Sequence, residues 1–169
     1  MKRVLFLDVD GVLNHAAWLK ANGRQNGNLS TEEWRLARHR AHLDPDCVAR
    51  LESVIKRTGC ALVLSSSWRY DVTPEEMTAR LRERGAPSAN VIDSTLLGSQ
   101  MPSGLYAGTQ RGNEVDEWLT RNGADSFAIV DDDAELEPHM ARLVQTSWEI
   151  GLQDEHVERL VALLGEARP

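Results

Sequence analysis

The sequence is poor in cysteine, in long apolar runs and in positive charge. Its 169 residues include two cysteines, Cys47 and Cys60, and no CxxC pair, so a disulfide framework is excluded and two reduced, buried thiols are expected. No apolar run approaches the length of a membrane span, and the four apolar residues before Asp8 are too few for the core of a signal peptide. We therefore expect a cytoplasmic protein with no membrane partner.

Charge and composition narrow the class of partner further. A formal net charge of −7 argues against a generally basic surface for nucleic acid, although a local basic patch stays open. Hydrophobic residues make up 41% and charged residues 27% of the chain, which is ordinary for a globular protein. Because the chain has no internal repeat, low-complexity segment or interdomain linker, residues 1–169 are expected to form one domain.

The most informative stretch is VLFLDVDGVLN, residues 4–14. Its four leading apolar residues predict a strand buried on both faces, as in the centre of a parallel sheet. Asp8 and Asp10 follow at the end of that strand, and Gly11 lets the backbone turn sharply away. Carboxylates at the end of a buried strand are costly unless they are paired, hydrogen-bonded or bound to a metal. The stretch therefore predicts a metal-assisted carboxylate site.

Strand and helix patterns alternate along the rest of the chain, which predicts an open, doubly wound α/β domain. Further strands are expected at residues 60–64, 89–95, 126–130 and 143–146. Helices are expected at residues 45–58, 73–85, 113–122 and 154–164, and a loop at 96–110. The first of these helices has Asp44 as its N-cap and Gly59 just past its end, and Thr73 opens a capping box in the second.

About thirty residues separate the first strand from the next helix, where a plain loop takes about two to six. The segment contains Trp18 and Trp34, and its parts at 15–21 and 30–42 suit helices. Since it leaves from the edge of the predicted site, we expect a small lid- or cap-like insertion at about residues 15–43. The alternative is a packing insertion whose tryptophans cover the edge of the sheet.

Three of the buried strands end in polar groups. These are Asp8 and Asp10, the serines at 65–67 and the aspartates at 131–133. In open α/β sheets the ligand site lies beyond the carboxyl ends of the strands, so these groups are expected to converge. Crowded carboxylates raise one another's pKa values, and a hard divalent cation such as Mg²⁺ relieves that repulsion. Hydroxyl donors and a basic residue favour phosphoryl transfer over a metal-buffer site.

The ordered motifs resemble those of the haloacid dehalogenase (HAD) superfamily of phosphatases. The first motif, hhhhDxDG, matches residues 5–11, and the second, a strand that ends in Ser or Thr, matches Ser65. The third, a basic residue near a helix start, matches Arg111, and the fourth, a strand that ends in paired acids, matches Asp131 and Asp132. The resemblance implies a three-layer Rossmann-like α/β fold with a central parallel sheet and a small insertion after the first strand.

The resemblance also implies roles for these residues. Asp8 would be the nucleophile that forms an aspartyl-phosphate, and Asp10 the acid and base that serves both half-reactions. Ser65 would hold the phosphoryl oxygens, and Arg111 would neutralise charge on phosphate and nucleophile. The metal ligands for Mg²⁺ would be Asp8, the Asp10 carbonyl, Asp131 and Asp132.

Some assignments leave alternatives open. Arg111 is an arginine where family members often have lysine, and Arg69, Arg121 and Arg57 are its rivals. Ser66 is a second candidate for phosphate binding, and together with Ser67 and Arg69 it either contacts substrate or satisfies the turn after the strand. Asp133 is expected to be a loop residue rather than a ligand.

Other chemistry-bearing residues give weaker signals. A weak metal-site pattern lies at residues 39–47, but its members straddle a helix end and Pro45; they are His39, His42, Asp44 and Cys47. Trp68 and Trp118 are expected in the core rather than as stacking platforms. Trp18 or Trp34 either stacks on a base of a nucleic-acid substrate or packs against the fold.

We predict a Mg²⁺-dependent phosphomonoester hydrolase. Three segments, at 8–14, 65–69 and 111–119, resemble the small HAD domains of bacterial and phage RNA-repair proteins. That narrower resemblance favours an RNA or DNA end as the substrate. The alternatives are a small-molecule or nucleotide phosphatase, an inactive phosphate- or partner-binding module, and a receiver-like phospho-acceptor. The sequence leaves the oligomeric state open.

Overall fold

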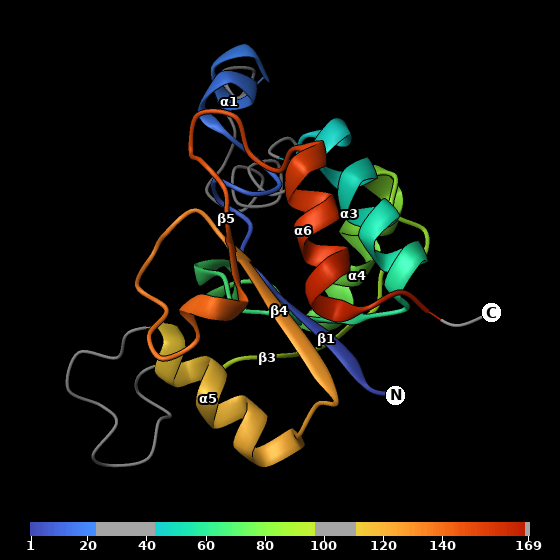
Figure 1. Cartoon of the computed structure of the whole chain (residues 1–169). Coiled ribbons are helices and arrows are strands. Elements are labelled where there is room, and N and C mark those ends of the chain that lie inside the picture. Colours follow the sequence, from blue (N-terminus) through green and yellow to red (C-terminus); the bar gives the residue numbers. More distant parts are fainter. Residues whose placement is uncertain (23–42, 97–110, 168–169) are drawn as a thin grey trace.

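A computed structural model of the chain describes residues 1–22, 43–96 and 111–167 (Figure 1). One parallel sheet runs through it in the strand order β3-β2-β1-β4-β5. The strands are β1 (Arg3–Leu7), β2 (Ala61–Leu64), β3 (Val91–Ser94), β4 (Ser126–Asp131) and β5 (Leu143–Gln145). Chain order reverses between β1 and β4, which is the switch point where open α/β sheets bind ligands. The predicted Rossmann-like fold with a central parallel sheet is confirmed.

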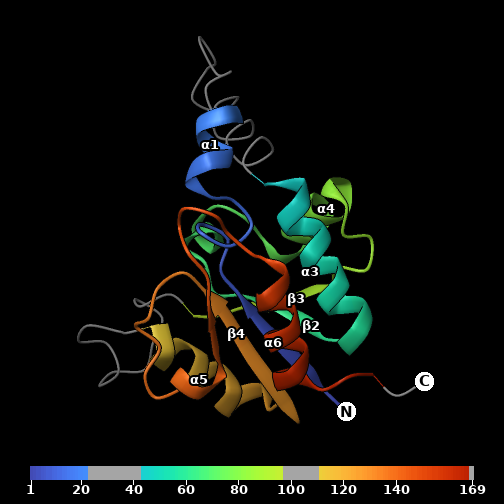
Figure 2. The same cartoon turned by 45° about the horizontal axis from the view of Figure 1, so that its top comes forward.

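Helices cover both faces of the sheet and make three layers (Figures 1 and 2). Helices α3, α4 and α6 lie on one face and α5 lies on the other, while α1 stands beyond the end of the sheet. Their bounds are α1 (Ala16–Asn22), α3 (Pro45–Thr58), α4 (Pro74–Arg84), α5 (Arg111–Asn122) and α6 (Asp154–Leu164). Two 3₁₀ turns complete the described elements, η1 (Ser67–Tyr70) and η3 (Met140–Arg142).

Capping side chains set the starts of two helices as the sequence predicts. The Asp44 carboxylate accepts a hydrogen bond from the backbone N–H of Asp46 at 2.9 Å, and Gly59 ends α3 with a left-handed φ of 66°. Thr73 and Glu76 form a reciprocal capping box at the start of α4. Both helices therefore begin at a proline whose missing N–H costs nothing in the first turn.

Alternate residues of β1 enter two separate cores, because the strand is covered on both faces. Leu5 and Leu7 pack in the larger core with α3, α4 and α6, whereas Phe6 packs with Trp118 of α5 in the smaller one. The Phe6 and Trp118 rings meet edge to face with centroids 5.4 Å apart. Trp118 is thus a core residue, as predicted, and Trp68 is buried as well.

Strand register brings the predicted site residues to one level. Leu7 pairs with Leu64 on one side and with Val130 on the other. The next residue of each strand therefore stands at the same edge of the sheet. The backbone N–H of Asp8 donates to the Val130 carbonyl at 3.0 Å, and that of Ser65 to the Leu7 carbonyl at 3.0 Å. The ladder thus extends into the site and fixes its backbone.

Some predictions differ from the structure or fall outside it. Helix α5 begins at Arg111, two residues before its predicted start. The predicted helix at 30–42, Trp34 and nearly all of the loop at 96–110 lie outside the described residues. The predicted lid at 15–43 is described only at its two ends and stays a prediction. Within the described ranges, every helix is too short or too polar to cross a membrane.

Candidate active site

Asp8 and Asp131 are joined by one guanidinium group at the carboxyl end of the sheet. Nη1 of Arg111 lies 2.7 Å from Asp8 Oδ1 and 2.5 Å from Asp131 Oδ2. Both carboxylates are buried, and Arg111 reaches them from the first residue of α5. Of the three rivals for its place, Arg57 pairs with surface Glu158 and Arg121 with Glu117 of its own helix.

The third rival, Arg69, lies near the site but is engaged by the backbone. Its guanidinium donates to the carbonyls of Ser65 and Ser66, at 2.6 and 2.8 Å, and to the Glu114 carboxylate at 2.7 Å. It therefore holds the turn after β2 against α5. Arg111 alone of the four candidates contacts the carboxylates of the strand ends.

A glycine lets α5 start where Arg111 reaches the site. A Cβ atom at Gly112 would lie 2.0 Å from the carbonyl oxygen of Glu137. The first turn of α5 thus packs directly against the backbone of the segment that follows β4. A side chain at this position would displace the helix start together with Arg111.

The position of the Asp132 carboxylate depends on a second glycine, Gly11. Gly11 has a φ of +76°, and a Cβ there would lie 2.3 Å from Cγ of Asp132. Bare backbone at Gly11 therefore makes room for the Asp132 side chain next to the turn after β1. One ligand atom from each of Asp8, Asp131 and Asp132 lies within 4.8 Å of the others. The structure thus brings these three predicted ligands together.

Asp10 is held by two side chains that the sequence did not assign. Its Oδ2 accepts from the indole N–H of Trp68 at 3.0 Å, and its Oδ1 accepts from the Asn14 amide at 2.6 Å. Asn14 also accepts the backbone N–H of Gly11 at 3.1 Å. Both residues stand within the segments that carry the family resemblance, at 8–14 and 65–69. Their place in these segments is the signal that sequence reasoning could use, and burial of Trp68 agrees with its prediction as a core residue.

The two candidate serines differ in their surroundings. Ser65 is fully buried, and its hydroxyl has no hydrogen-bond partner among the residues that the structure describes. A buried hydroxyl without a partner is unusual and suits a ligand oxygen. The Ser66 hydroxyl accepts the backbone N–H of Trp68 at 3.4 Å and caps η1. Ser66 therefore satisfies the turn after β2.

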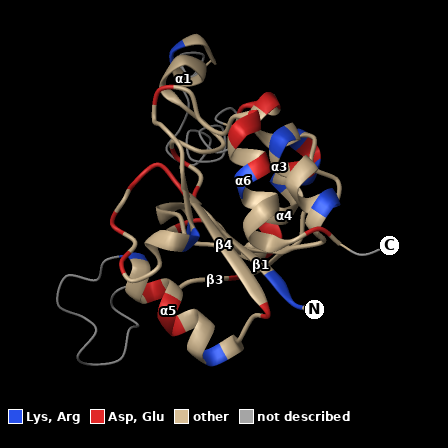
Figure 3. Ribbon diagram, viewed as in Figure 1, with Lys and Arg blue, Asp and Glu red and all other residues tan. Residues whose placement is uncertain are grey.

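Electrostatics favour a cation at the three carboxylates. Burial raises the pKa of Asp8 to about 8, and the charge of Asp131 adds to the rise while Arg111 opposes it. Burial also raises the pKa values of Asp131 and Asp132. Figure 3 shows further acidic residues along the loop after β4. Since one guanidinium cannot balance three carboxylates, the donor set fits a hard divalent ion with oxygen ligands.

Comparison with known protein families identifies the family to which the chain belongs. The model of one family, described as the HAD domain in Swiss Army Knife RNA repair proteins, matches residues 4–157. The chain belongs to this family. No curated protein and no solved structure matches the chain. HAD enzymes are hydrolases, with phosphatase chemistry as a main activity, and they generally use a divalent metal.

A cavity of about 240 Å³ adjoins the carboxylates of this HAD domain. Three residues of η1 line it together with Arg111 and with acidic residues that follow β4; the η1 residues are Ser67, Arg69 and Tyr70. Tyr70 is 64% exposed, and its ring lies 5.7 Å from the Arg69 guanidinium carbon. The cavity therefore gives a ligand access to Arg111 past an exposed aromatic ring.

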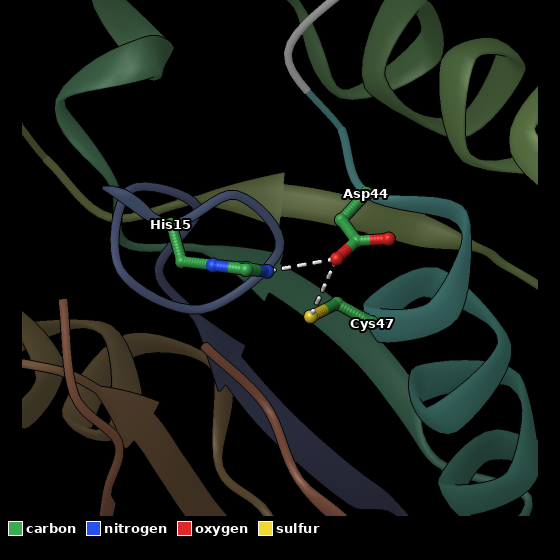
Figure 4. Close-up of side chains that lie close together, drawn as sticks. All are labelled: His15, Asp44 and Cys47. Atoms are coloured by element: carbon green, nitrogen blue, oxygen red, sulfur yellow. Dashed lines mark hydrogen bonds and ion pairs between the residues drawn. The ribbon is translucent and has the colours of Figure 1, made fainter. Parts of the chain in front are cut away.

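A second cluster of the HAD domain lies at the start of α3 (Figure 4). His15 Nε2 is 2.8 Å and Cys47 Sγ is 3.8 Å from Oδ2 of Asp44. The other His15 nitrogen lies 3.1 Å from the Glu149 carbonyl, and the thiol also donates to the Leu152 carbonyl. Of the metal site sketched from the sequence, Asp44 and Cys47 do lie together, whereas the other two histidines fall outside the described residues.

This second cluster does not supply a nucleophile. Burial, aided by the charge of Asp44, raises the pKa of the Cys47 thiol to about 11. A thiol in that state is a poor nucleophile at neutral pH. The cluster instead joins the segment after β1, the start of α3 and the loop before α6.

Proposed function

We propose that this HAD domain is a Mg²⁺-dependent phosphomonoester hydrolase that works through an aspartyl-phosphate. The observation that carries the proposal is the shared guanidinium: Arg111 joins Asp8 to Asp131. On the neighbouring strand end, the buried Ser65 hydroxyl has no hydrogen-bond partner within the described part of the chain. A nucleophile, a phosphate-binding cation and a hydroxyl donor thus stand around one point at the end of β1. Positioning and charge stabilisation of this kind account for most of the catalysis in phosphoryl transfer.

The first half-reaction transfers the phosphoryl group to Asp8. Arg111 contacts one carboxylate oxygen, Oδ1, which leaves Oδ2 to attack phosphorus. As the Asp8–phosphorus bond forms, the bond from phosphorus to the ester oxygen breaks and that oxygen takes a proton from Asp10. Arg111 and the Ser65 hydroxyl hold the phosphoryl oxygens throughout.

The second half-reaction releases phosphate. A water molecule attacks phosphorus and gives its proton to Asp10, and the bond between phosphorus and the Asp8 oxygen breaks. Asp10 is then protonated again for the next ester. Mg²⁺, held by Asp8, the Asp10 carbonyl, Asp131 and Asp132, would supply positive charge for the phosphoryl oxygens and would relieve the repulsion among the carboxylates.

A polynucleotide end is the substrate class that we propose. The family description names RNA repair proteins, and the exposed Tyr70 ring at the cavity offers a surface on which a terminal base could stack. The net charge of −7 limits nucleic-acid contact to such a local site. A nucleotidase, a small-molecule phosphatase and an inactive binding module are competing outcomes of the test.

The test is a parallel phosphate-release assay with Mg²⁺. Its substrates are RNA and DNA oligonucleotides with 3′- or 5′-phosphates, mononucleotides, sugar phosphates, phosphopeptides and p-nitrophenyl phosphate. We expect turnover of p-nitrophenyl phosphate and of one oligonucleotide end, and no turnover by Asp8→Asn. A preference of about a hundredfold or more for free nucleotides would overturn the substrate class. Absence of turnover on all substrates, or full turnover by Asp8→Asn, would overturn the mechanism.

A further inference from the structure

The four residues of η1 contact two parts of the site, the cavity and Asp10. Ser67, Arg69 and Tyr70 line the cavity beside Arg111. Trp68, between them, is buried with 6% of its surface exposed and donates its indole N–H to Asp10 at 3.0 Å. One short turn thus connects the cavity to the residue assigned as acid and base.

Asp10 is fixed from a second direction by its own turn. The Asn14 amide donates to Asp10 Oδ1 at 2.6 Å, and Asn14 is itself buried and tied to the backbone N–H of Gly11. The Gly11 carbonyl in turn accepts the hydroxyl of Thr146, the residue just past β5, at 2.8 Å. Among the described residues, each oxygen of Asp10 therefore has one donor. A carboxylate offers about four lone-pair sites, so a site on each oxygen stays available for proton transfer.

We propose that Trp68 and Asn14 are positioning residues that hold Asp10 for proton transfer, and that Trp68 couples this placement to the turn that lines the cavity. The inference rests on the proposed function, because it assumes that Asp10 exchanges protons with the ester oxygen and with water. Two donors fix the carboxylate torsion that would otherwise rotate freely. Small misplacements of a reacting group cost large factors in rate. Loss of this restraint should therefore slow proton transfer from Asp10 to the ester oxygen and leave the attack of Asp8 on phosphorus unaffected.

The choice of leaving group distinguishes proton transfer by Asp10 from attack on phosphorus by Asp8. Phosphorus is attacked by Asp8 in every ester, but the proton from Asp10 is needed only when the departing oxygen is strongly basic. The alkoxide of glycerol 2-phosphate needs that proton, and p-nitrophenolate leaves without it. The ratio of kcat/KM for these two esters therefore reports on the placement of Asp10, and a loss of general stability does not change it.

Trp68→Phe removes the N–H donor and keeps an aromatic ring in the core. We expect kcat/KM for glycerol 2-phosphate to fall about tenfold or more and that for p-nitrophenyl phosphate to fall less than about threefold. Asn14→Leu is expected to change the ratio in the same direction. In an Asp10→Ala background, Trp68→Phe should leave the ratio unchanged, because the residue that it positions is gone.

The chain contains a matched control for the tryptophan. Trp118 is also buried, and its indole N–H also donates to a carboxylate, that of Asp93 at 2.7 Å. Trp118→Phe thus makes the same chemical change in the core on the other side of the sheet, and we expect the ratio of the two esters to stay as in the unmodified protein. Equal losses on both esters in Trp68→Phe, or the same ratio in both tryptophan variants, would overturn the inference alone. An unmodified protein that turns over neither these esters nor any phosphorylated oligonucleotide would overturn the proposed function and the inference with it.

Discussion

Two buried carboxylates, Asp8 and Asp44, have opposite surroundings although each lies beside a basic group. Asp8 shares a single guanidinium with Asp131 and has Asp132 close by. Asp44 has His15 to itself and caps α3 with its other oxygen. The first carboxylate stands in a group with more negative than positive charge, and the second has a donor for each oxygen. Uncompensated negative charge among buried carboxylates indicates a ligand site, whereas a carboxylate with a donor for each oxygen indicates a structural contact.

The contrast predicts different costs for the same substitution. Asp8→Asn should lower turnover of p-nitrophenyl phosphate by about 10⁴-fold or more, because the nucleophile is lost. Asp44→Asn should keep turnover within about threefold and lower the free energy of unfolding by about 1–2 kcal/mol, through the weakened cap and the weakened contact with His15. Steady-state kinetics and urea unfolding measure the two effects. Loss of turnover in Asp44→Asn at unchanged stability would place the second cluster in catalysis.

The next largest effect on activity is expected for a substitution at the start of α5. Gly112→Ala should lower kcat/KM by about a hundredfold, because the added methyl group collides with the Glu137 carbonyl and displaces Arg111 from Asp8. Asn113→Ala, one residue further along the same turn and half-buried, is the control and should retain activity. If Gly112→Ala also retains activity, the position of Arg111 is not set by this contact.

Stability should depend on pH at Asp8, and it should depend on Mg²⁺ through the carboxylates of Asp8, Asp131 and Asp132. The pKa of Asp8 is raised in the folded protein to about 8, so its contribution to stability is fully present below about pH 4 and is lost as the pH rises toward 8. Mg²⁺ binds the ionised carboxylates, so saturating ion should raise the Tm by about 5–10 °C at pH 8 and by less at pH 5. Thermal unfolding with and without Mg²⁺ measures both effects. Asp131→Asn should abolish the Mg²⁺ response and Asp44→Asn should keep it; a response lost in both variants would contradict the assignment.

The sequence predicted the fold and the carboxylate group because both depend on local patterns. Apolar runs give the strands, caps such as Asp44 and Thr73 give the helix starts, and parallel strands bring their ends to one edge. Asp8, Ser65 and Asp131 follow directly from that register. Sequence pattern alone does not distinguish Arg111 from the other three arginines, because its reach depends on the close approach of Gly112 to the backbone of Glu137.

The supports of Asp10 could not be predicted in the same way. Trp68 is 58 residues away in the chain from Asp10, and burial of its ring is explained equally well by packing. Only the direction of its N–H distinguishes a positioning residue from a core residue, and periodicity carries no such information. For the same reason, the sequence did not pair His15 with Asp44 across 29 residues.

The smallest effect on turnover is expected at Cys47. This residue tests whether the second cluster, unlike the carboxylates around Asp8, is purely structural. Its thiol is fully buried and its pKa is raised to about 11, so little thiolate exists at neutral pH. Iodoacetamide should therefore modify Cys47 slowly in the folded protein and rapidly in urea, as followed by mass spectrometry. Cys47→Ser should change turnover of p-nitrophenyl phosphate by less than about twofold, because the hydroxyl can still donate to Asp44 or to the Leu152 carbonyl. Rapid labelling of the folded protein with loss of turnover would show instead that the thiol is reactive, and the division between a charged ligand site and a paired structural cluster would fail.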